Sequence, residues 1–312
     1  MLFIYRFITI SLYPFLIILI YLRKLANKED KKRFKEKIFP SCFSPEKNTY
    51  KKLIWFHAAS IGEVQSIIPI IEKLITDNKN IEILITTVTL SAGNIVKKKL
   101  YKYKNIKHRY FPLDINFLIK LFLEKWRPNL IIFVDSEIWP NTLVEIKRRN
   151  IPIALINGRI TKKTFKRWMI APKFAKRIFS NFDLCLASSK ESEGHLKKLE
   201  VKKLKYIGNI KFSGKIEKND LIDKNLEILK KKNFWCAAST HKGEEIFCLK
   251  THLHLKKIYE NIVTIIIPRH ISRSLEISKL CKKNNLSFQI LNDRELIESQ
   301  KEIIIVNSFG TL

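Results

Sequence analysis

From Tyr50 onward, short apolar runs alternate with longer mixed segments, and this alternation restricts the possible folds more than any other feature of the chain. A short run rich in Ile, Leu and Val predicts a buried strand, and the mixed segment after it has the length of a helix. Successive strand–helix units predict a parallel sheet with helices on both faces. We therefore expect an α/β protein built on a doubly wound sheet.

The first series of units covers the part of the chain before about residue 212. Its predicted strands are Leu53–His57, Ile81–Thr87, Leu130–Val134, Ile153–Ile156 and Leu184–Ala187. Its predicted helices are Val64–Thr76, Ser91–Tyr101, Asn141–Asn150, Lys163–Phe179 and Lys190–Leu199. Pro140 fits the first position of its helix, where its missing N–H costs nothing.

A second series follows the charged stretch SGKIEKNDLIDKN, which is the natural domain boundary. Its predicted elements are strand Phe234–Ala238, helix Gly243–Tyr259, strand Ile262–Ile267, helix Ser272–Asn284, strand Ser287–Leu291 and strand Glu302–Val306. A parallel sheet that stops there lacks the helices needed to cover both faces. We expect this second domain to be incomplete.

The chain is strongly basic: 59 Lys and Arg against 29 Asp and Glu give a formal net charge of +30 among 312 residues. Such an excess favours nucleic acid, an anionic membrane surface or a phosphorylated substrate as a partner. The lysines are scattered over nearly every segment, which also fits a compositional bias towards lysine. No helix-turn-helix, zinc or aromatic-platform signature is present, so we expect no nucleic-acid partner. The five cysteines form no metal-binding spacing, and no metal site is predicted.

The first residues are of a different character. Leu2 to Leu22 is almost entirely apolar and about long enough to cross ~30 Å of hydrocarbon as one helix. The segment after it carries a positive excess, which places that flank, and so the bulk of the chain, in the cytoplasm. An amphipathic or buried core helix is the alternative. We expect a membrane-anchor helix over residues 1–22.

Polar side chains follow several predicted strands. Glu63 stands in HAASIGEV, where an acid in the first helical turn caps the helix favourably and needs no other role. The same position lies at the carboxyl ends of the strands, where open α/β sheets bind ligands. Other polar groups come at the same edge: Asp135 and Glu137 in DSEIWPN, Arg159 in NGRIT, Ser239, Thr240 and His241 in STHKGEE, and Arg269 in PRH.

Seven motifs connect these positions: HAASIGEV, FPLD, DSEIWPN, NGRIT, GNIKF, STHKGEE and IIPRH. In their order and spacing the chain resembles the bacterial Kdo transferases, from the apolar amino terminus to residue 312. These are membrane-anchored glycosyltransferases that add 3-deoxy-D-manno-octulosonic acid (Kdo) to the lipid A precursor, lipid IVA, in lipopolysaccharide synthesis. The resemblance implies transfer from CMP-Kdo at the cytoplasmic side of the cell inner membrane, without a cofactor.

The resemblance also implies a GT-B fold, in which two Rossmann-like domains face each other across a cleft. Residues 23–212 would form the acceptor-binding domain, and residues 213–312 a partial CMP-Kdo-binding domain, with the anchor helix of residues 1–22 ahead of them.

Site roles follow from the same resemblance. Glu63 matches the base that takes the proton from the acceptor hydroxyl, Glu137 a second cleft carboxylate, and Lys211 a residue that stabilises the transition state. Lysine suits this task, because CMP leaves with negative charge that a cation can stabilise without a metal. The CMP-binding positions match Pro268, Arg269, Phe309, Gly310 and Thr311, and the supporting cleft residues are Ser239, Thr240, His241 and Arg159.

The chain departs from the family pattern at its carboxyl end. Where the family usually has Met-Gly-Glu, it has Phe309, Gly310 and Thr311, so the acidic residue that contacts the nucleotide is absent. The family's later glycine-rich segment and Asn-Pro-Leu-Glu motif do not occur before residue 312. We therefore expect weakened donor binding. Two functions stay open: a Kdo transferase, or a catalytically inactive, membrane-associated remnant that at most binds acceptor lipid.

Overall fold

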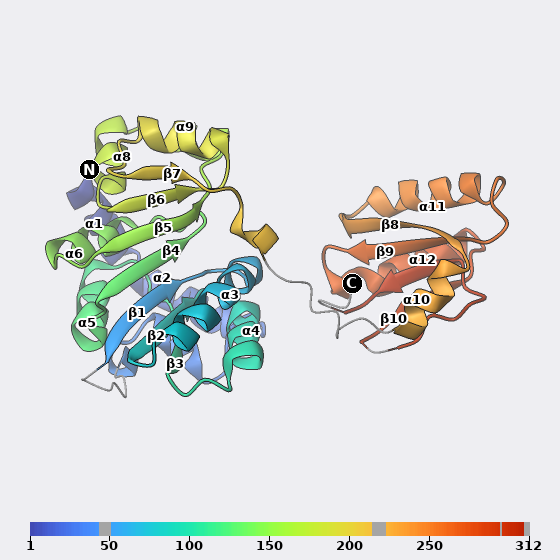
Figure 1. Ribbon diagram of the computed structural model, residues 1–312, viewed down its shortest axis with the longest axis horizontal. Helices are drawn as coiled ribbons and strands as arrows, with labels where there is room; N and C mark the ends of the chain where they lie inside the picture. Colours follow the sequence, from blue (N-terminus) through green and yellow to red (C-terminus); the bar gives the residue numbers. More distant parts are fainter. Residues whose placement is uncertain (44–50, 214–222, 294, 309–312) are drawn as a thin grey trace. The chain divides into compact units, whose positions relative to one another are not determined.

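Two α/β units make up the chain, Met1–Gly214 and Lys215–Leu312 (Figure 1). The computed structural model describes residues 1–43, 51–213, 223–293 and 295–308. Each unit has its own parallel sheet and its own apolar core, as the alternation of apolar and mixed segments predicts.

The sheet of the first unit has seven parallel strands in the order β3-β2-β1-β4-β5-β6-β7. These strands are β1 (Lys52–His57), β2 (Ile81–Thr87), β3 (Ile106–Tyr110), β4 (Leu130–Val134), β5 (Ile153–Gly158), β6 (Leu184–Ala187) and β7 (Leu204–Tyr206). The helices between them are α3 (Ile61–Asp77), α4 (Leu90–Leu100), α5 (Asn116–Trp126), α6 (Pro140–Arg148), α7 (Lys162–Trp168), α8 (Pro172–Phe179) and α9 (Lys190–Lys198). The strand order reverses between β1 and β4, so the switch point of a doubly wound sheet lies at their carboxyl ends.

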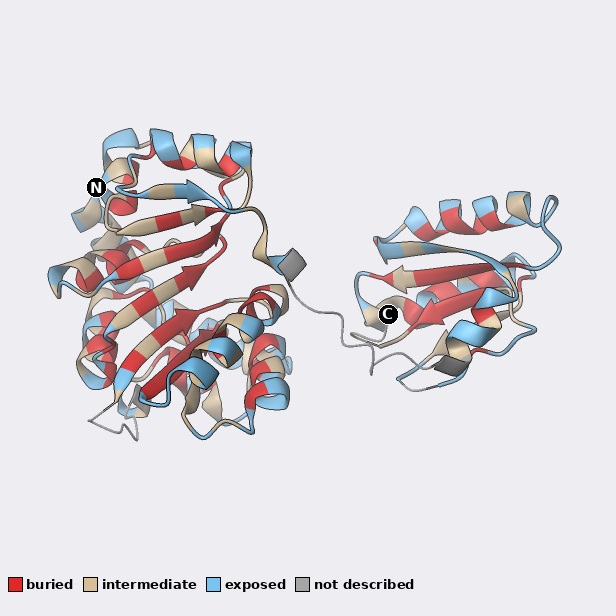
Figure 2. Ribbon diagram, in the orientation of Figure 1, coloured by how far each residue is buried: buried red, intermediate tan, exposed pale blue. Residues whose placement is uncertain are grey.

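The core of the first unit lies on both faces of this sheet. Alternate residues of β1 serve the two faces: Trp55 packs with residues of α5 and α6, whereas Phe56 packs with α3 and α4. Figure 2 shows β1 and β4 as mostly buried strands in the middle of the sheet. A fully buried large apolar side chain contributes about 1.5–3 kcal/mol to the stability of the fold. The packing of these side chains holds the central strands, and so the loops at their ends, in fixed positions.

The second unit has four parallel strands in the order β10-β11-β9-β8. Its elements are α10 (Asp223–Lys230), β8 (Asn233–Thr240), α11 (Glu244–Leu255), β9 (Ile262–Pro268), α12 (Ser274–Lys283), β10 (Phe288–Leu291) and β11 (Ile303–Val306). Leu249 of α11 and Ile277 of α12 pack on one face, and Leu229 of α10 packs with Val263 and Ile265 on the other. The last strand in sequence is thus an interior strand of the sheet.

Several elements differ from the prediction. Strands β3 and β7 and helices α5 and α10 were not expected. Both strands are edges of the sheet and carry charged residues, so they show no apolar run. The expected helix Lys163–Phe179 is two helices, since Pro172 starts α8 and cannot lie inside a continuous helix.

The prediction of a single helix over residues 1–22 is wrong, because the segment forms two helices. The segment folds as α1 (Leu2–Ser11) and α2 (Tyr13–Leu25), which are bent by 52° with respect to each other. Pro14 lies in the first turn of α2, where its ring would clash with a carbonyl of a continuous helix. In the described part of the chain no single helix has the length and apolar character of a membrane span, but this bent pair meets both criteria together.

Both helices contact the rest of the first unit through polar groups. The Tyr5 hydroxyl donates to Asp114 Oδ2 at 2.9 Å, and Arg6 Nε donates to Asn141 Oδ1 at 3.3 Å. From α2, the Tyr13 hydroxyl donates to the carbonyl of Ile38 at 2.5 Å. The helix pair is therefore attached to the first unit by specific contacts.

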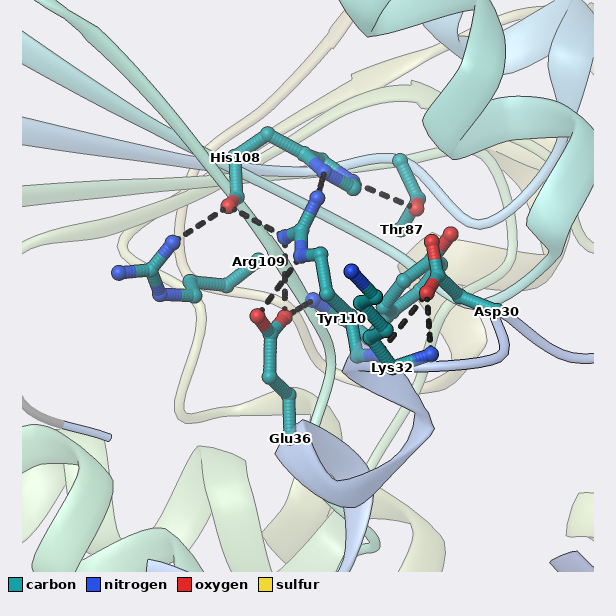
Figure 3. A network of polar contacts seen from close by, with 8 residues as sticks. Asp30, Lys32, Glu36, Thr87, His108, Arg109 and Tyr110 are labelled. Carbon is teal, nitrogen blue, oxygen red and sulfur yellow. Dashed lines mark hydrogen bonds and ion pairs between the residues drawn. The ribbon is translucent and has the colours of Figure 1, made fainter. Parts of the chain in front are cut away.

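A polar network fastens the 3₁₀ helix η1 (Arg33–Lys37) to the edge strand β3 (Figure 3). Arg33 donates to Glu36 at 2.8 and 3.0 Å, to the His108 carbonyl at 2.7 Å and to His108 Nδ1 at 3.1 Å. Because arginine only donates, Nδ1 is the acceptor and His108 Nε2 carries the proton toward Thr87 Oγ1, 2.9 Å away. The network thus requires a neutral His108 ring.

We predict a loss of stability on mild acidification that originates at His108. Burial, followed by the charges of Arg33 and Arg109, lowers its pKa from 6.5 to about 3. The unfolded chain takes up this proton and the folded chain does not, so stability is complete above about pH 6.5 and falls as the pH drops towards 3. The expected slope is at most about 1.4 kcal/mol per pH unit.

Denaturant unfolding of wild type and His108→Asn at about pH 7.5 and about pH 5 measures this effect. Asn cannot be protonated, so the wild type should lose more stability than the variant between the two pH values. His270→Asn, at an exposed position, is the control and should retain the wild-type pH dependence. Equal pH dependence in wild type and His108→Asn would contradict the prediction.

Candidate functional site

Glu63 lies in the first turn of α3, directly after β1, and only 7% of its surface is exposed. Its Oε2 accepts a hydrogen bond from the Ala59 N–H at 2.7 Å, and its Oε1 accepts one from the Ser60 hydroxyl at 2.7 Å. The Ser60 hydroxyl in turn accepts a hydrogen bond from the Glu63 N–H at 3.4 Å, as in a capping box. The capping role considered for Glu63 is therefore real, and any catalytic role is additional to it.

The pKa of the Glu63 carboxyl group is raised, which a capping role does not require. Burial raises the pKa of its carboxyl group, the charges of Glu137 and Asp135 raise it further, and the two hydrogen bonds oppose them. A carboxyl group whose pKa is raised towards neutrality is a better proton acceptor once ionised. Glu63 thus has the environment of a general base.

Glu137 ends a chain of buried hydrogen bonds. Its Oε2 accepts from His57 Nε2 at 3.2 Å and from Trp139 Nε1 at 3.0 Å. On the other side of the imidazole ring, His57 Nδ1 lies 2.9 Å from the hydroxyl of Thr86, which accepts from Trp55 Nε1 at 2.8 Å. Burial acts to raise the pKa of Glu137, but the hydrogen bonds from His57 and Trp139 outweigh it, and the net pKa is low. Glu137 is held in place as an ionised carboxylate.

Lys211 comes from η3 (Ile210–Ser213) and reaches back over the first turn of α3. Its Nζ lies 3.2 Å from Asp135 Oδ2, and a Cβ added at Gly62 would lie 3.8 Å from its Cε. Two elements far apart in sequence thus place a cation beside Gly62, in the first turn of α3. The structure brings Glu63, Glu137 and Lys211 to one edge of the sheet, at the switch point between β1 and β4.

A polar cavity of about 350 Å³ adjoins this edge. It is lined by residues at the carboxyl ends of four strands and by the start of α9: Asp135, Asn157, Arg159, Thr161, Ser188, Ser189, Glu191, Ser192, Asn209 and Lys211. Arg159, expected as a supporting residue, is therefore in the same cavity as Lys211. The cavity has two cations, two carboxylates and an abundance of hydroxyl and amide groups, which suits a polar ligand.

The remaining predicted residues belong to the second unit. Strands β8 and β9 are neighbours, so their carboxyl ends bring Ser239, Thr240 and His241 beside Pro268 and Arg269. The Arg269 N–H donates to the Thr240 carbonyl at 3.0 Å. Arg273 fixes this edge through two hydrogen bonds to the buried Glu245, at 2.7 and 2.9 Å. Phe309, Gly310 and Thr311 lie outside the described residues.

Two functional candidates, His57 and Asp135, have no role assigned from the sequence. His57 was considered part of a buried strand, although it is the last residue of that strand and precedes the HAASIGEV glutamate by six positions. Asp135 was noted at a strand end but received no role. Its left-handed backbone, with φ of 62°, is a strained conformation that only the structure reveals.

No group of three or more potential metal ligands occurs among the described residues.

Two α/β units with parallel sheets and polar groups at the strand ends define a GT-B-like protein. Solved structures agree with this fold. The UDP-GlcNAc 2-epimerase of Neisseria meningitidis bound to UDP-GlcNAc aligns with a TM-score of 0.53 at 15% identity, over 82% of this chain and 72% of that one. A putative UDP-N-acetylglucosamine 2-epimerase from Listeria monocytogenes gives 0.57 at 9% identity, over 83% and 70%. At such identities the likeness concerns the fold alone.

Sequence comparison gives the family. The family model described as 3-deoxy-D-manno-octulosonic-acid transferase (kdotransferase) matches residues 31–214. The 3-deoxy-D-manno-octulosonic acid transferase of Rickettsia bellii is 30% identical over 311 residues, covering 99% of this chain and 73% of the relative. A probable mitochondrial transferase of the same name from Arabidopsis thaliana is 31% identical, covering 99% and 70%. The chain belongs to the Kdo transferase family, and it is a glycosyltransferase of lipopolysaccharide core synthesis.

Proposed function

We propose that the chain transfers Kdo from CMP-Kdo to lipid IVA. The observation that carries this proposal is the meeting of Glu63, Glu137 and Lys211 at the switch point of the first unit. Each group has the protonation state that the reaction needs. Glu63 is a buried carboxylate with a raised pKa, Glu137 is an ionised carboxylate, and Lys211 is a cation. Membership in the family supplies the substrate class.

In the proposed reaction, Glu63 takes the proton from an acceptor hydroxyl while the hydroxyl oxygen forms a bond to the anomeric carbon of Kdo. The bond between that carbon and the phosphate oxygen breaks, and CMP leaves with the electron pair. Lys211 stabilises the negative charge on the leaving phosphate, and ionised Glu137 stabilises positive charge that develops on the sugar. In this proposal the first unit binds the acceptor, and Arg269 and its neighbours in the second unit bind the donor.

A transferase assay with CMP-Kdo and lipid IVA, followed by mass spectrometry of the lipid product, tests this proposal. The expected result is a mass increase by one or more Kdo residues. A protein that folds and binds lipid IVA but forms no product would instead be the inactive remnant that the carboxyl-terminal departures from the family pattern allow.

We also propose that the helix pair α1–α2 attaches the enzyme to the cytoplasmic face of the inner membrane. Large apolar side chains on the pair are exposed, among them Phe3 at 80%, Phe7 at 62% and Phe15 at 68%. Tyr5 and Arg6 contact the first unit at the same time, which supports a pair lying along the leaflet. Basic residues that follow the pair, such as Arg23 and Lys24, suit an anionic surface.

Membrane attachment predicts that the wild type sediments with membranes and needs detergent for release. The triple variant Phe3→Lys, Phe7→Lys, Phe15→Lys should move mostly to the soluble fraction, because each buried Phe contributes about 1.5–3 kcal/mol. Ile170→Lys is the matched control, since Ile170 is 84% exposed in another part of the first unit. Recovery of wild type in the soluble fraction at low salt without detergent would contradict the proposal.

A further inference from the structure

Helix α1 has two different faces. Phe3 and Phe7, one turn apart, are 80% and 62% exposed and belong to the surface proposed to contact the membrane. Tyr5 and Thr9, also one turn apart, lie on the opposite side of the helix. This second face forms hydrogen bonds with segments far along the chain, at the start of α6.

The start of α6 is capped by a residue from another segment. Trp139, directly before the helix, has no side-chain oxygen that could accept from the first N–H groups. Asp114 supplies the acceptors instead: Oδ2 accepts from the Asn141 N–H at 3.0 Å, and Oδ1 accepts from the Thr142 N–H at 2.8 Å. A carboxylate is favourable at this position, because the amino end of a helix is positive. Asp114 thus fixes the helical turn that directly follows Trp139.

Helix α1 holds this cap through three side chains. The Tyr5 hydroxyl donates to Asp114 Oδ2 at 2.9 Å, and Arg6 Nε donates to Asn141 Oδ1 at 3.3 Å. Asn141 Nδ2 donates to Thr9 Oγ1 at 3.4 Å and to the Asp114 carbonyl at 2.6 Å. Asp114 is 7% exposed and Asn141 is fully buried, so water cannot readily replace these bonds. The polar face of α1 is therefore part of the structure that sets the start of α6.

The same structure leads on to Glu137. Trp139 Nε1 donates to Glu137 Oε2 at 3.0 Å, so the residue directly before α6 holds the carboxylate. Phe111 begins the segment that ends at Asp114, and its ring centroid lies 5.6 Å from that of Trp139. It also lies 4.1 Å from the ring centroid of His57, which bonds Glu137 from the other side. An unbroken series of contacts thus connects α1 with the Glu137 carboxylate.

We infer that α1 positions the Glu137 loop for the transfer reaction, with Tyr5 as a positioning residue that acts through Asp114. This inference rests on the proposed function, in which Glu137 stabilises charge on the reacting sugar. The helix pair then has a role in turnover that is separate from membrane attachment. A small displacement of a positioned group is enough to lower turnover by about one to two orders of magnitude.

Tyr5→Phe and Tyr13→Phe form a matched pair of variants, because each removes one hydroxyl from the helix pair and keeps the ring. Tyr5 donates to Asp114, whereas Tyr13 donates to the carbonyl of Ile38. Tyr5→Phe should lower kcat about tenfold and change the KM for CMP-Kdo less than about twofold, because the donor binds to the second unit in the proposed function. Tyr13→Phe should keep kcat within about twofold of wild type. Both variants should match the wild type in sedimentation with membranes, since Phe is apolar.

The state of the Glu137 loop is measured independently of turnover by fluorine NMR of the full chain in detergent. In protein labelled with fluorotryptophan, the Trp139 resonance is identified by its absence from the spectrum of Trp139→Phe. Tyr5→Phe should shift or broaden this resonance, because the turn that follows Trp139 loses part of its support. Tyr13→Phe should leave the resonance unchanged.

The inference is wrong if Tyr5→Phe leaves the Trp139 resonance unchanged, or if Tyr5→Phe and Tyr13→Phe lower kcat alike. The latter result would mean that the helix pair supports the fold without positioning the loop. The two measurements separate this inference from the proposed function. A wild type that transfers no Kdo, but whose Trp139 resonance responds to Tyr5→Phe alone, would overturn the function and keep the positioning. Kdo transfer by Tyr5→Phe with kcat within about twofold of wild type would overturn the positioning alone.

Discussion

Glu63→Gln is expected to lower turnover about 10²- to 10⁴-fold while the protein still folds and binds acceptor lipid. Glutamine keeps the shape of the side chain and can accept the hydrogen bond from the Ala59 N–H, but it cannot take a proton from the acceptor hydroxyl. If Glu63 were only a capping residue, the variant would lose at most about 1 kcal/mol of stability and keep its turnover. The two roles therefore separate in one experiment that measures turnover and unfolding together.

The pH profile gives a second readout for Glu63. Burial and the neighbouring carboxylates raise its pKa above the ordinary value of 4.5, so kcat/KM should rise with pH through that raised pKa. The Gln variant should lack this acid limb in its residual activity. Glu72→Gln, a partly exposed glutamate of the same helix, is the matched control and should leave both turnover and profile unchanged. Turnover of Glu63→Gln within about threefold of wild type would exclude Glu63 as the base.

Asp114→Ala is expected to destabilise the first unit by about 3 kcal/mol or more, the largest effect we expect of a single substitution on stability. The buried Asp114 carboxylate accepts from the Tyr5 hydroxyl at 2.9 Å and from the Asn141 N–H at 3.0 Å. It also accepts from the N–H and the hydroxyl of Thr142, at 2.8 and 2.6 Å. Alanine leaves these donors without an acceptor in a site with little room for water.

Asp114→Ala should also lower turnover, because it disturbs the loop that carries Glu137. Asp114 holds the start of α6, and Glu137 and Trp139 lie in the loop directly before that helix. Asp114→Asn keeps one acceptor oxygen and should cost less stability, but it should still lower turnover by loosening the Glu137 loop. Urea unfolding followed by Trp fluorescence measures the stability change. Asp77→Ala, at the exposed end of α3, is the control, and a loss below about 1 kcal/mol for Asp114→Ala would contradict the prediction.

Much of the fold could be predicted because the central strands carry their own signal. The strands β1, β2, β4 and β6 lie within one residue of the predicted ranges, since buried parallel strands are continuous apolar runs. Edge strands such as β3 lack this signal, because their exposed side selects charged residues. The break between α1 and α2 could have been expected from Pro14, which lies within the apolar segment.

The sequence by itself determined the alternation of strands and helices, the family, and the polar residues that end the strands. These properties depend on residue types at fixed spacings along the chain, which a sequence displays directly. Only the tertiary structure decided which polar groups meet and in what state. The ion pair of Lys211 with Asp135 spans 76 positions, and the hydrogen bond between His57 and Glu137 spans 80. Such pairs depend on strand order, and the pKa of Glu63 depends on burial by distant segments, so neither can be read from local sequence.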